Sequence, residues 1–368
     1  MRWINSPRRC ILLSPTRNKV TLSSPKTVGP VLLLLGAVLV IGVISLSLGA
    51  VEIRPLEIAA ILANKLGLSL PVSYEPSEEA LLWTIRLPRV FCGLFVGAGL
   101  ALSGAVLQGL FRNPLADPTL IGVSSGAALA AVSCLVLGET ILRHVPSGLA
   151  LFVVPLASFG GGFLLVNLVW RLSRQEGRTQ ISTMLLAGIA LNSLCGAGIG
   201  VLTFLANDAQ LRSITFWSLG SLGGTTWPIV GVLAALTVLP ALWLARQARA
   251  LNVLLLGEAE AGHLGVNVEH LKQRIILAAA LIVGVSVSFV GIIGFVGLVT
   301  PHLIRLWLGP DYRRLLPCAA LLGAFLLMAS DLAARLVVTP AELPIGVVTA
   351  LLGAPFFLWI LRRERQQL

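Results

Sequence analysis

Residues 82–118 read LWTIRLPRVFCGLFVGAGLALSGAVLQGLFRNPLADP and form the most informative segment of the chain. Between Arg89 and Arg112 this segment holds no charged residue. At about 1.5 Å per helical residue it is long enough to cross a hydrocarbon core of about 30 Å. Prolines stand at both ends, where they limit a helix rather than interrupt it. The pattern predicts a membrane-spanning helix with arginines at its two ends.

The composition extends this interpretation to the whole chain. Of 368 residues, 56% are hydrophobic and only 12% are charged, whereas a soluble domain carries about 25% charged residues. The mean hydropathy of +0.92 agrees. These values exclude a soluble enzyme, a disordered chain and a nucleic-acid-binding module. The sequence predicts one all-α polytopic membrane domain.

Apolar segments recur from residue 28 to the C-terminal region, and we expect ten transmembrane helices. The break between the seventh and eighth is blurred by Gly291, Gly294 and Gly297. The expected spans are about 28–50, 82–109, 119–138, 147–170, 181–206, 226–245, 274–290, 291–308, 315–337 and 346–361.

The distribution of basic residues predicts the orientation. With ten spans both termini lie on one side, and 20 of the 27 lysines and arginines map to that side. The positive-inside rule makes it the cytoplasm, which accounts for the net charge of +11. Residues 1–27 form a basic cytoplasmic extension; a cleaved signal peptide is the alternative. The seven basic residues on the outside are Arg54, Lys65, Arg86, Arg89, Arg143, Arg212 and Arg335.

The motif Arg86-Leu87-Pro88-Arg89 lies at the predicted outer end of the second span. One interpretation is that its arginines reach the membrane interface. The other is a docking site for acidic groups of an external partner, because guanidinium binds carboxylates in a bidentate manner. Arg335 is predicted near the same face, and it is spaced to pair with Asp331 four residues earlier on one helix.

Two further segments lie on the predicted inner side. In residues 108–118 an Asn-Pro step and a second proline break the helix, which fits either a tight turn or a gate beside a pathway. In the loop 246–274 we expect Asn252 to cap one short helix and Glu258 to begin another that ends at Gly265. Its apolar residues fit either a helix on the bilayer or a surface that a cytoplasmic partner covers.

The sequence lacks several motifs of catalysis and cofactor binding. There is no phosphate-binding GxxxxGK[ST] loop, no HExxH and no GxSxG. The five cysteines are scattered without a CxxC pair, and His302 is a lone histidine in a predicted span, so we expect no metal site. Buried acids or histidines that could relay protons are missing, which weakens an ion-coupled secondary transporter without excluding it. A membrane enzyme would need polar catalytic groups in the spans, and the sequence shows no convincing set of them.

Over about residues 30–362 the sequence resembles the permease subunits of type II ABC importers, the family for cobalamin, ferric siderophores and haem. The motifs that carry the resemblance are long and occur in the family's order. They are RLPR at 86–89, RNPLADP at 112–118, LLAGIALN at 185–192, LNVLLLGE at 251–258, GFVGLVTPH at 294–302 and AELPIGVVTALLGAP at 341–355.

The resemblance implies a homodimer in the bacterial inner membrane, with a permease domain at 28–362 and a cytoplasmic tail at 363–368. Two cytoplasmic ABC ATPase subunits bind ATP and Mg, a periplasmic binding protein delivers the substrate, and the permease itself needs no cofactor. Arg86, Arg89 and Arg335 match positions that dock the binding protein. Asn113 and Leu115 match the inner gate. The positions that match the ATPase coupling loop are Gly257, Glu258, Ala261, Leu264 and Gly265.

Within the family, residues 196–224 (GAGIGVLTFLANDAQLRSITFWSLGSLGG) resemble the haem permeases most. The resemblance therefore implies alternating access to haem, with a ferric siderophore or cobalamin as the alternative substrate. An ion-coupled secondary transporter is the alternative of a different class.

Overall fold

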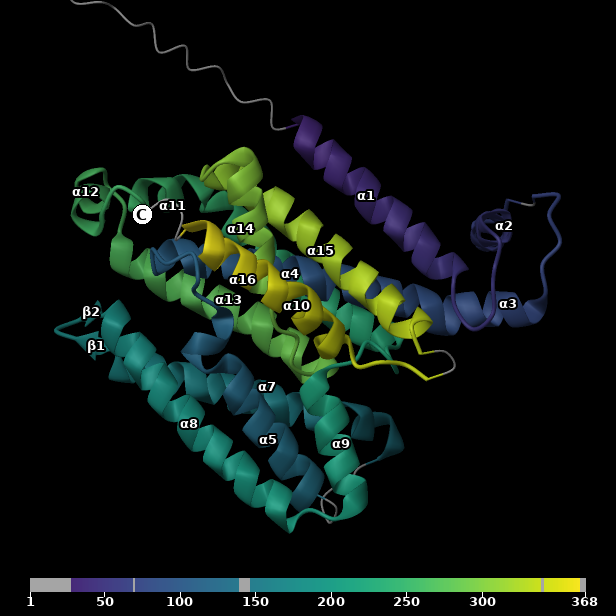
Figure 1. Cartoon of the computed structure of the whole chain (residues 1–368), viewed down its shortest axis with the longest axis horizontal. Coiled ribbons are helices and arrows are strands. Elements are labelled where there is room, and N and C mark those ends of the chain that lie inside the picture. The colour runs from purple at the N-terminus through teal and green to yellow at the C-terminus, as the bar shows by residue number, and fades with distance from the viewer. Residues whose placement is uncertain (1–27, 69, 139–145, 339–340, 365–368) are drawn as a thin grey trace, which may run out of the picture.

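The computed structural model describes residues 28–364, apart from residue 69, residues 139–145 and residues 339–340 (Figure 1). The predicted basic extension 1–27 and residues 365–368 of the predicted tail lie outside the described residues. In chain order the elements are α1 (Val28–Ser47), α2 (Pro55–Lys65), α3 (Pro76–Leu81), η1 (Leu82–Arg86), α4 (Leu87–Leu110), η2 (Pro118–Ile121), α5 (Val123–Leu137), α7 (Ser147–Leu172), β1 (Arg174–Gln175), β2 (Arg178–Thr179), α8 (Ile181–Leu205), α9 (Asp208–Leu219), α10 (Trp227–Arg246), α11 (Ala248–Leu254), α12 (Glu258–His263), α13 (Val268–Val290), α14 (Val296–Leu308), α15 (Tyr312–Leu336) and α16 (Ile345–Glu364).

Seven helical segments of the described chain are long and apolar enough to cross a membrane. They are α1, the continuous rod from α3 through η1 to α4, most of α7, and α8, α10, α13 and α15. Three shorter apolar helices, α5, α14 and α16, occupy the remaining predicted segments. The chain is therefore a multi-pass helical membrane protein. Helix α9 was not expected from the sequence, because its polar residues interrupt the apolar pattern.

The break predicted among the glycines of residues 291–297 is confirmed. Helix α13 ends at Val290 and α14 begins at Val296. Between them, Gly291 has φ +75° and Phe295 has φ +68°, and a single helix cannot continue through left-handed backbone. The seventh and eighth predicted segments are thus two separate helices.

One small hairpin departs from the all-α expectation. Strands β1 and β2 pair antiparallel, with Arg174 opposite Thr179 and Gln175 opposite Arg178. Glu176 and Gly177 connect them, and both have positive φ, which is the backbone of the tight turn that joins short antiparallel strands. The hairpin closes the connection between α7 and α8.

Helix α4 lies at the centre of the larger group of helices, against α10, α13, α14 and α15 (Figure 1). Glycines have no side chain and so let the helix backbones approach closely. Membrane helices depend on such packing, because lipid provides no hydrophobic drive between them. A Cβ atom on Gly97 would lie 2.4 Å from the Gly323 carbonyl oxygen, and one on Gly104 would lie 1.8 Å from the Gly297 oxygen. The backbones of α15 and α14 thus rest directly on α4.

A second group consists of α5, α7 and α8, which Figure 1 shows beside the first group. Helix α13 contacts α5 and α7 as well as α4 and so connects the two groups. The faces of α5 and α7 meet at Gly126 and Gly161, where a Cβ on either would lie 2.5 Å from the other's carbonyl oxygen. The two ends of the molecule are also distinct: α2 and α3 lie at one end, and α11, α12 and the hairpin lie at the opposite end (Figure 1).

Candidate functional site

The three arginines singled out in the sequence lie together at the end of the bundle where α4 begins and α15 ends. We call these residues, with Asp331 and Glu342, the Arg89 cluster. Arg86 and Arg335 approach the same point, since a Cβ on Gly49 would lie 3.0 Å from Arg86 Nη2 and 3.8 Å from Arg335 Nη1. Residues more than 200 positions apart in the sequence thus form one charged site.

A widened helical turn positions the first two arginines. Pro88 stands at the start of α4, and the π-helical turn η1 precedes it. A proline ring clashes with the carbonyl four residues earlier in a regular helix, and a π turn relieves such crowding. The turn therefore lets the rod from α3 to α4 continue through the RLPR motif.

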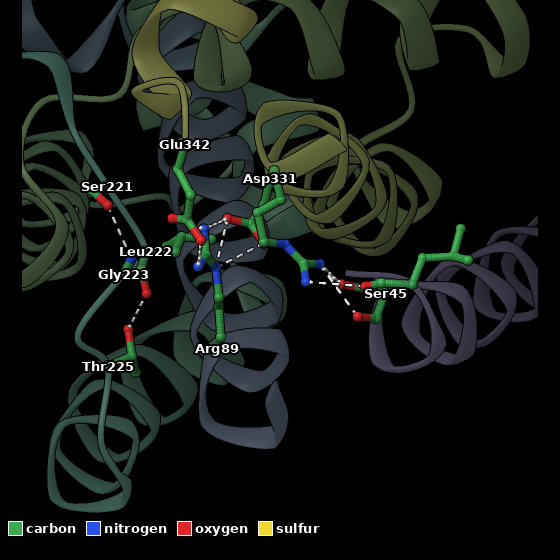
Figure 2. A network of polar contacts seen from close by, with 10 residues as sticks. Ser45, Arg89, Ser221, Leu222, Gly223, Thr225, Asp331 and Glu342 are labelled. Atoms are coloured by element: carbon green, nitrogen blue, oxygen red, sulfur yellow. Dashed lines mark hydrogen bonds and ion pairs between the residues drawn. The ribbon is translucent and has the colours of Figure 1, made fainter. Parts of the chain in front are cut away.

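Arg89 binds two carboxylates, one on each edge of its guanidinium group (Figure 2). Asp331 of α15 accepts hydrogen bonds from Nε at 3.0 Å and from Nη2 at 2.9 Å. Glu342, in the segment before α16, accepts from Nη1 and from Nη2, both at 2.9 Å. Both bidentate edges of the guanidinium are therefore occupied.

Arg86 and Arg335 bind the C-terminal end of α1, whose last carbonyls have no partner within the helix. Arg86 donates to the carbonyl oxygens of Leu46 and Ser47 at this end and to that of Val51 in the loop that follows. Arg335 donates to the Ser45 hydroxyl at 2.6 Å, and its Nε lies 3.2 Å from Asp331. The pairing of Asp331 with Arg335 expected from their spacing is confirmed.

Burial distinguishes the members of the cluster. Arg86 is 5% and Arg89 is 9% exposed, and the Asp331 side chain is 5% exposed, whereas that of Glu342 is 46% exposed. The sequence suggested either arginines at the membrane interface or arginines that present themselves to a partner. In this conformation each guanidinium instead contacts carbonyls or carboxylates of its own chain, as buried charges require.

At the opposite end of α4 the RNPLADP segment forms a sharp, exposed turn. The helix ends at Leu110, and Arg112 adopts φ +47°, a left-handed cap that glycine usually provides. The Asn113 side chain accepts a hydrogen bond from the Leu115 backbone N–H at 2.9 Å. Asn113 and Leu115 are both exposed, so the two predicted gate residues lie on the surface of this turn.

The loop 246–274 lies at the same end and contains two short helices. Gly257 with φ +137° precedes α12, and Gly265 with φ +83° follows it, so the predicted second short helix is confirmed. Leu256 and Leu264 are 67% and 63% exposed. Ala261 is fully buried and therefore anchors the helix rather than presenting itself to a partner.

The prediction for Asn252 is wrong in its position. Asn252 lies inside α11, which begins at Ala248, so it does not start that helix. Its side chain instead accepts a hydrogen bond from the Tyr312 backbone N–H at 2.9 Å and donates to Asp311 at 2.6 Å. The residue caps α15, which is remote in sequence, and helix propensity alone gives no sign of such a contact.

Glu258 ties α12 to α13 through an ion pair with Lys272 at 2.7 Å. Glu269 accepts hydrogen bonds from the Thr179 backbone N–H, at 3.0 Å, and from its hydroxyl, which holds the hairpin against α13. These contacts surround a cavity of about 810 Å³ that lies between β2, the start of α8, and the α12–α13 segment. This end of the molecule therefore has a concave surface lined by both charged and apolar side chains, and Leu256 and Leu264 are exposed at the two ends of α12.

The described residues contain no group of three or more histidine, cysteine, aspartate or glutamate side chains that could hold a metal. The four cysteines that the structure describes, Cys92, Cys134, Cys195 and Cys318, are free. Sequence reasoning missed the role of Glu342 in the arginine site and that of the α1 end. The AELPIG motif contained the signal for Glu342, as an acidic residue next to a predicted outer helix end.

Comparison with known proteins gives consistent results. The FecCD transport family model matches residues 37–363. The chain is 46% identical to the hemin transport system permease protein of Yersinia pestis over 306 residues, which is 82% of this chain and 90% of that protein. It is 43% identical to the cobalamin import system permease protein of Halobacterium salinarum over 288 residues, 78% and 74% of the two chains. It is 41% identical to a vitamin B12 import system permease protein of Escherichia coli over 293 residues, 80% and 87% of the two chains.

A solved structure described as an inward-facing conformation of a putative metal-chelate type ABC transporter is also similar. Its TM-score is 0.78 at 32% identity, and the match covers 90% of this chain and 98% of that one. The similarity therefore extends over nearly the whole described fold.

Proposed function

The chain belongs to the FecCD transport family of ABC importer permeases, and from this premise we propose that its substrate is haem. Its relatives are permease subunits, and ATP hydrolysis belongs to a separate chain. The observation that carries the choice of substrate is the 46% identity to a hemin permease over 82% of this chain. The cobalamin permeases, at 43% and 41%, support the alternative of another large chelate.

In the proposed topology all ten apolar helices cross the bacterial inner membrane, and both termini lie in the cytoplasm. The Arg89 cluster is then at the periplasmic end, and α11 and α12 are at the cytoplasmic end. Two copies of the chain form the pathway between them. Within one chain only 11% of the apolar stretch of α8 is buried. This exposure supports a second copy of the chain, or lipid, against α8.

Two partners act at the two ends. A periplasmic binding protein docks on Arg86, Arg89 and Arg335, and two ATPase subunits receive the segment from Gly257 to Gly265. The charge of the Arg89 cluster supports an acidic docking partner, because three arginines face only two carboxylates. The exposed Leu256 and Leu264, together with the cavity that residues of α12 line, support a protein partner at the other end.

Transport then proceeds by alternating access. The loaded binding protein and ATP each favour one of two conformations, and each shifts the population toward the one it binds more tightly. Movement of α12 changes the cytoplasmic turn that holds Asn113 and Leu115. The largely apolar helices would suit a large, planar chelate.

Uptake into proteoliposomes tests the proposal. We expect the permease, reconstituted with its cognate ATPase and binding protein, to accumulate haem with ATP and to carry ferric siderophores and cobalamin at least about tenfold more slowly. Liposomes that receive an ion gradient without ATP are the control for a secondary transporter. Faster uptake of a siderophore or of cobalamin would overturn the substrate, and uptake driven by the gradient alone would overturn the mechanism.

A further inference from the structure

We propose that Glu342 is an internal competitor for Arg89, and that a carboxylate of the docking protein replaces it on the guanidinium during docking. This inference rests on the proposed function, because it needs a binding protein that docks on the arginines. It adds a residue of this chain that opposes docking and sets its strength.

The first step is the occupancy of Arg89. A guanidinium has two edges that can bind a carboxylate in a bidentate manner. Asp331 fills the Nε edge and Glu342 fills the edge formed by Nη1 and Nη2, at distances of 2.9 to 3.1 Å (Figure 2). An incoming carboxylate therefore cannot bind Arg89 in a bidentate manner until one of the two resident carboxylates leaves.

The second step is which carboxylate leaves. Asp331 is buried between Arg89 and Arg335, and removing it would strand two buried charges, which is costly. The Glu342 side chain is 46% exposed, and its ion pair among the described residues is with Arg89, so it can return to water at small cost. Glu342 is therefore the carboxylate that leaves Arg89, because its removal costs less than that of Asp331.

The third step links the exchange to the pathway. Glu342 belongs to the short segment that leads into α16, where the Ile345 N–H donates to the Gly220 carbonyl at 3.1 Å. Gly346 also packs on this connection, since a Cβ there would lie 2.3 Å from the Leu219 oxygen. Figure 2 shows the α9–α10 connection, with Ser221 and Gly223, next to Glu342. Release of Glu342 therefore removes the contact by which α4 holds the segment that leads into α16 and packs on the α9–α10 connection.

The test measures binding of the cognate binding protein to the complete, nucleotide-free transporter in nanodiscs. We expect Glu342→Gln to bind it about five- to tenfold more tightly than wild type, because a neutral amide competes less well for Arg89. Glu342→Asp keeps the charge but is one methylene too short for the present contact, so we expect an intermediate gain of about two- to threefold. Glu52→Gln is the matched control, because Glu52 is an exposed carboxylate in the loop after α1, and it should change binding by less than about twofold.

Salt dependence separates competition from a structural effect. In wild type one ion pair replaces another, whereas in Glu342→Gln docking forms a pair without breaking one, so its affinity should fall more steeply with salt. The inference would be overturned if Glu342→Gln bound the binding protein no more tightly than Glu52→Gln, or more weakly than it. In that case ATP-driven uptake by the wild type would still support the proposed function. Absence of ATP-driven uptake by the wild type would instead overturn the proposed function. If Glu342→Gln fails to fold, Glu342→Asp is tested in its place, and it must bind the binding protein more tightly than Glu52→Gln does.

Discussion

The two ends of the molecule, the Arg89 cluster and the α11–α12 segment, present different kinds of surface to a partner protein. At the Arg89 cluster Arg86, Arg89 and Asp331 are buried, and each arginine contacts a group of the same chain. At the α11–α12 segment large apolar side chains are exposed beside polar ones, with Leu256 67% exposed and Leu264 63% exposed. A partner at the first end must exchange existing contacts, whereas a partner at the second end only has to cover what is already exposed.

The difference has energetic consequences. Exchange of one ion pair for another yields little net free energy but makes docking specific and sensitive to salt. Covering apolar side chains yields about 25 cal/mol per Å² and depends little on salt. A transiently docking partner suits the first arrangement, and a permanently bound one suits the second. The four predictions below test this contrast in order of expected effect.

The largest effect is expected from removing the buried counter-ion. Asp331→Ala leaves Arg89 and Arg335 without the carboxylate that both contact, so we expect the free energy of unfolding to fall by about 3–5 kcal/mol. Denaturant unfolding in detergent measures this. The half-exposed Glu342 provides the comparison, and Glu342→Ala should cost about 1 kcal/mol or less. Equal losses for the two variants would contradict the division of the cluster into a buried and an exchangeable carboxylate.

A charge placed on the apolar end should affect association rather than folding. Leu256→Asp puts a carboxylate where the proposed ATPase partner covers a leucine, and we expect the affinity for the ATPase to fall by about 2 kcal/mol, near thirtyfold. The free energy of unfolding should change by less than about 0.5 kcal/mol, since the side chain is exposed. Pull-down titration with purified ATPase measures the affinity. Leu66→Asp is the control, because Leu66 is 81% exposed after α2, at the other end of the molecule; an equal loss there would refute a local interface.

The backbone before α12 should be the next most sensitive feature. Gly257 has φ +137°, a backbone conformation that residues with a side chain rarely adopt. Gly257→Ala should therefore cost about 1–2 kcal/mol and weaken ATPase binding by misplacing α12. Gly262→Ala is the matched control, because Gly262 lies within α12 with nothing within 4 Å of a Cβ, and alanine there should be neutral or slightly stabilising. A neutral result for Gly257→Ala would show that the turn is not what positions α12.

The sequence predicted local features better than contacts between distant segments. Apolar runs located the helices, because each helix must satisfy its own backbone in lipid, and the spacing of Asp331 and Arg335 predicted their ion pair. The partners of Arg86 could not be predicted, since they are backbone carbonyls at the end of α1 and in the loop that follows. Asn252 was assigned to its own helix, although it caps α15. Such contacts depend on how helices pack, which periodicity does not encode.

The smallest effect is expected at Asp311, which links the α11–α12 segment to the helix that ends in the Arg89 cluster. Burial raises the pKa of this carboxyl, but hydrogen bonds from Asn252 and from the Arg313 backbone, with the charges of Arg313 and Arg314, outweigh burial, so the pKa lies below its usual value. A lowered pKa stabilises the fold above the ordinary aspartate pKa, which is about 3.9, and this stabilisation is lost as the pH falls through the lowered value.

Asn252→Ala should therefore make stability less dependent on pH in the acid range. The variant removes the hydrogen bond that lowers the pKa of Asp311 most, so its stability should be lower than that of the wild type by about 0.5–1.5 kcal/mol at neutral pH. This difference should narrow as the pH falls below the ordinary aspartate pKa, and the part that remains is the lost bond from the Tyr312 N–H. Thermal unfolding from about pH 2 to about pH 7 measures the two curves. Asn267→Ala is the control, because Asn267 caps α13 through the His270 N–H and its loss should shift the whole curve equally. Parallel curves for Asn252→Ala and wild type would mean that the Asn252 contact does not lower the pKa of Asp311, and that the α11–α15 junction responds to acid no differently from an ordinary helix cap.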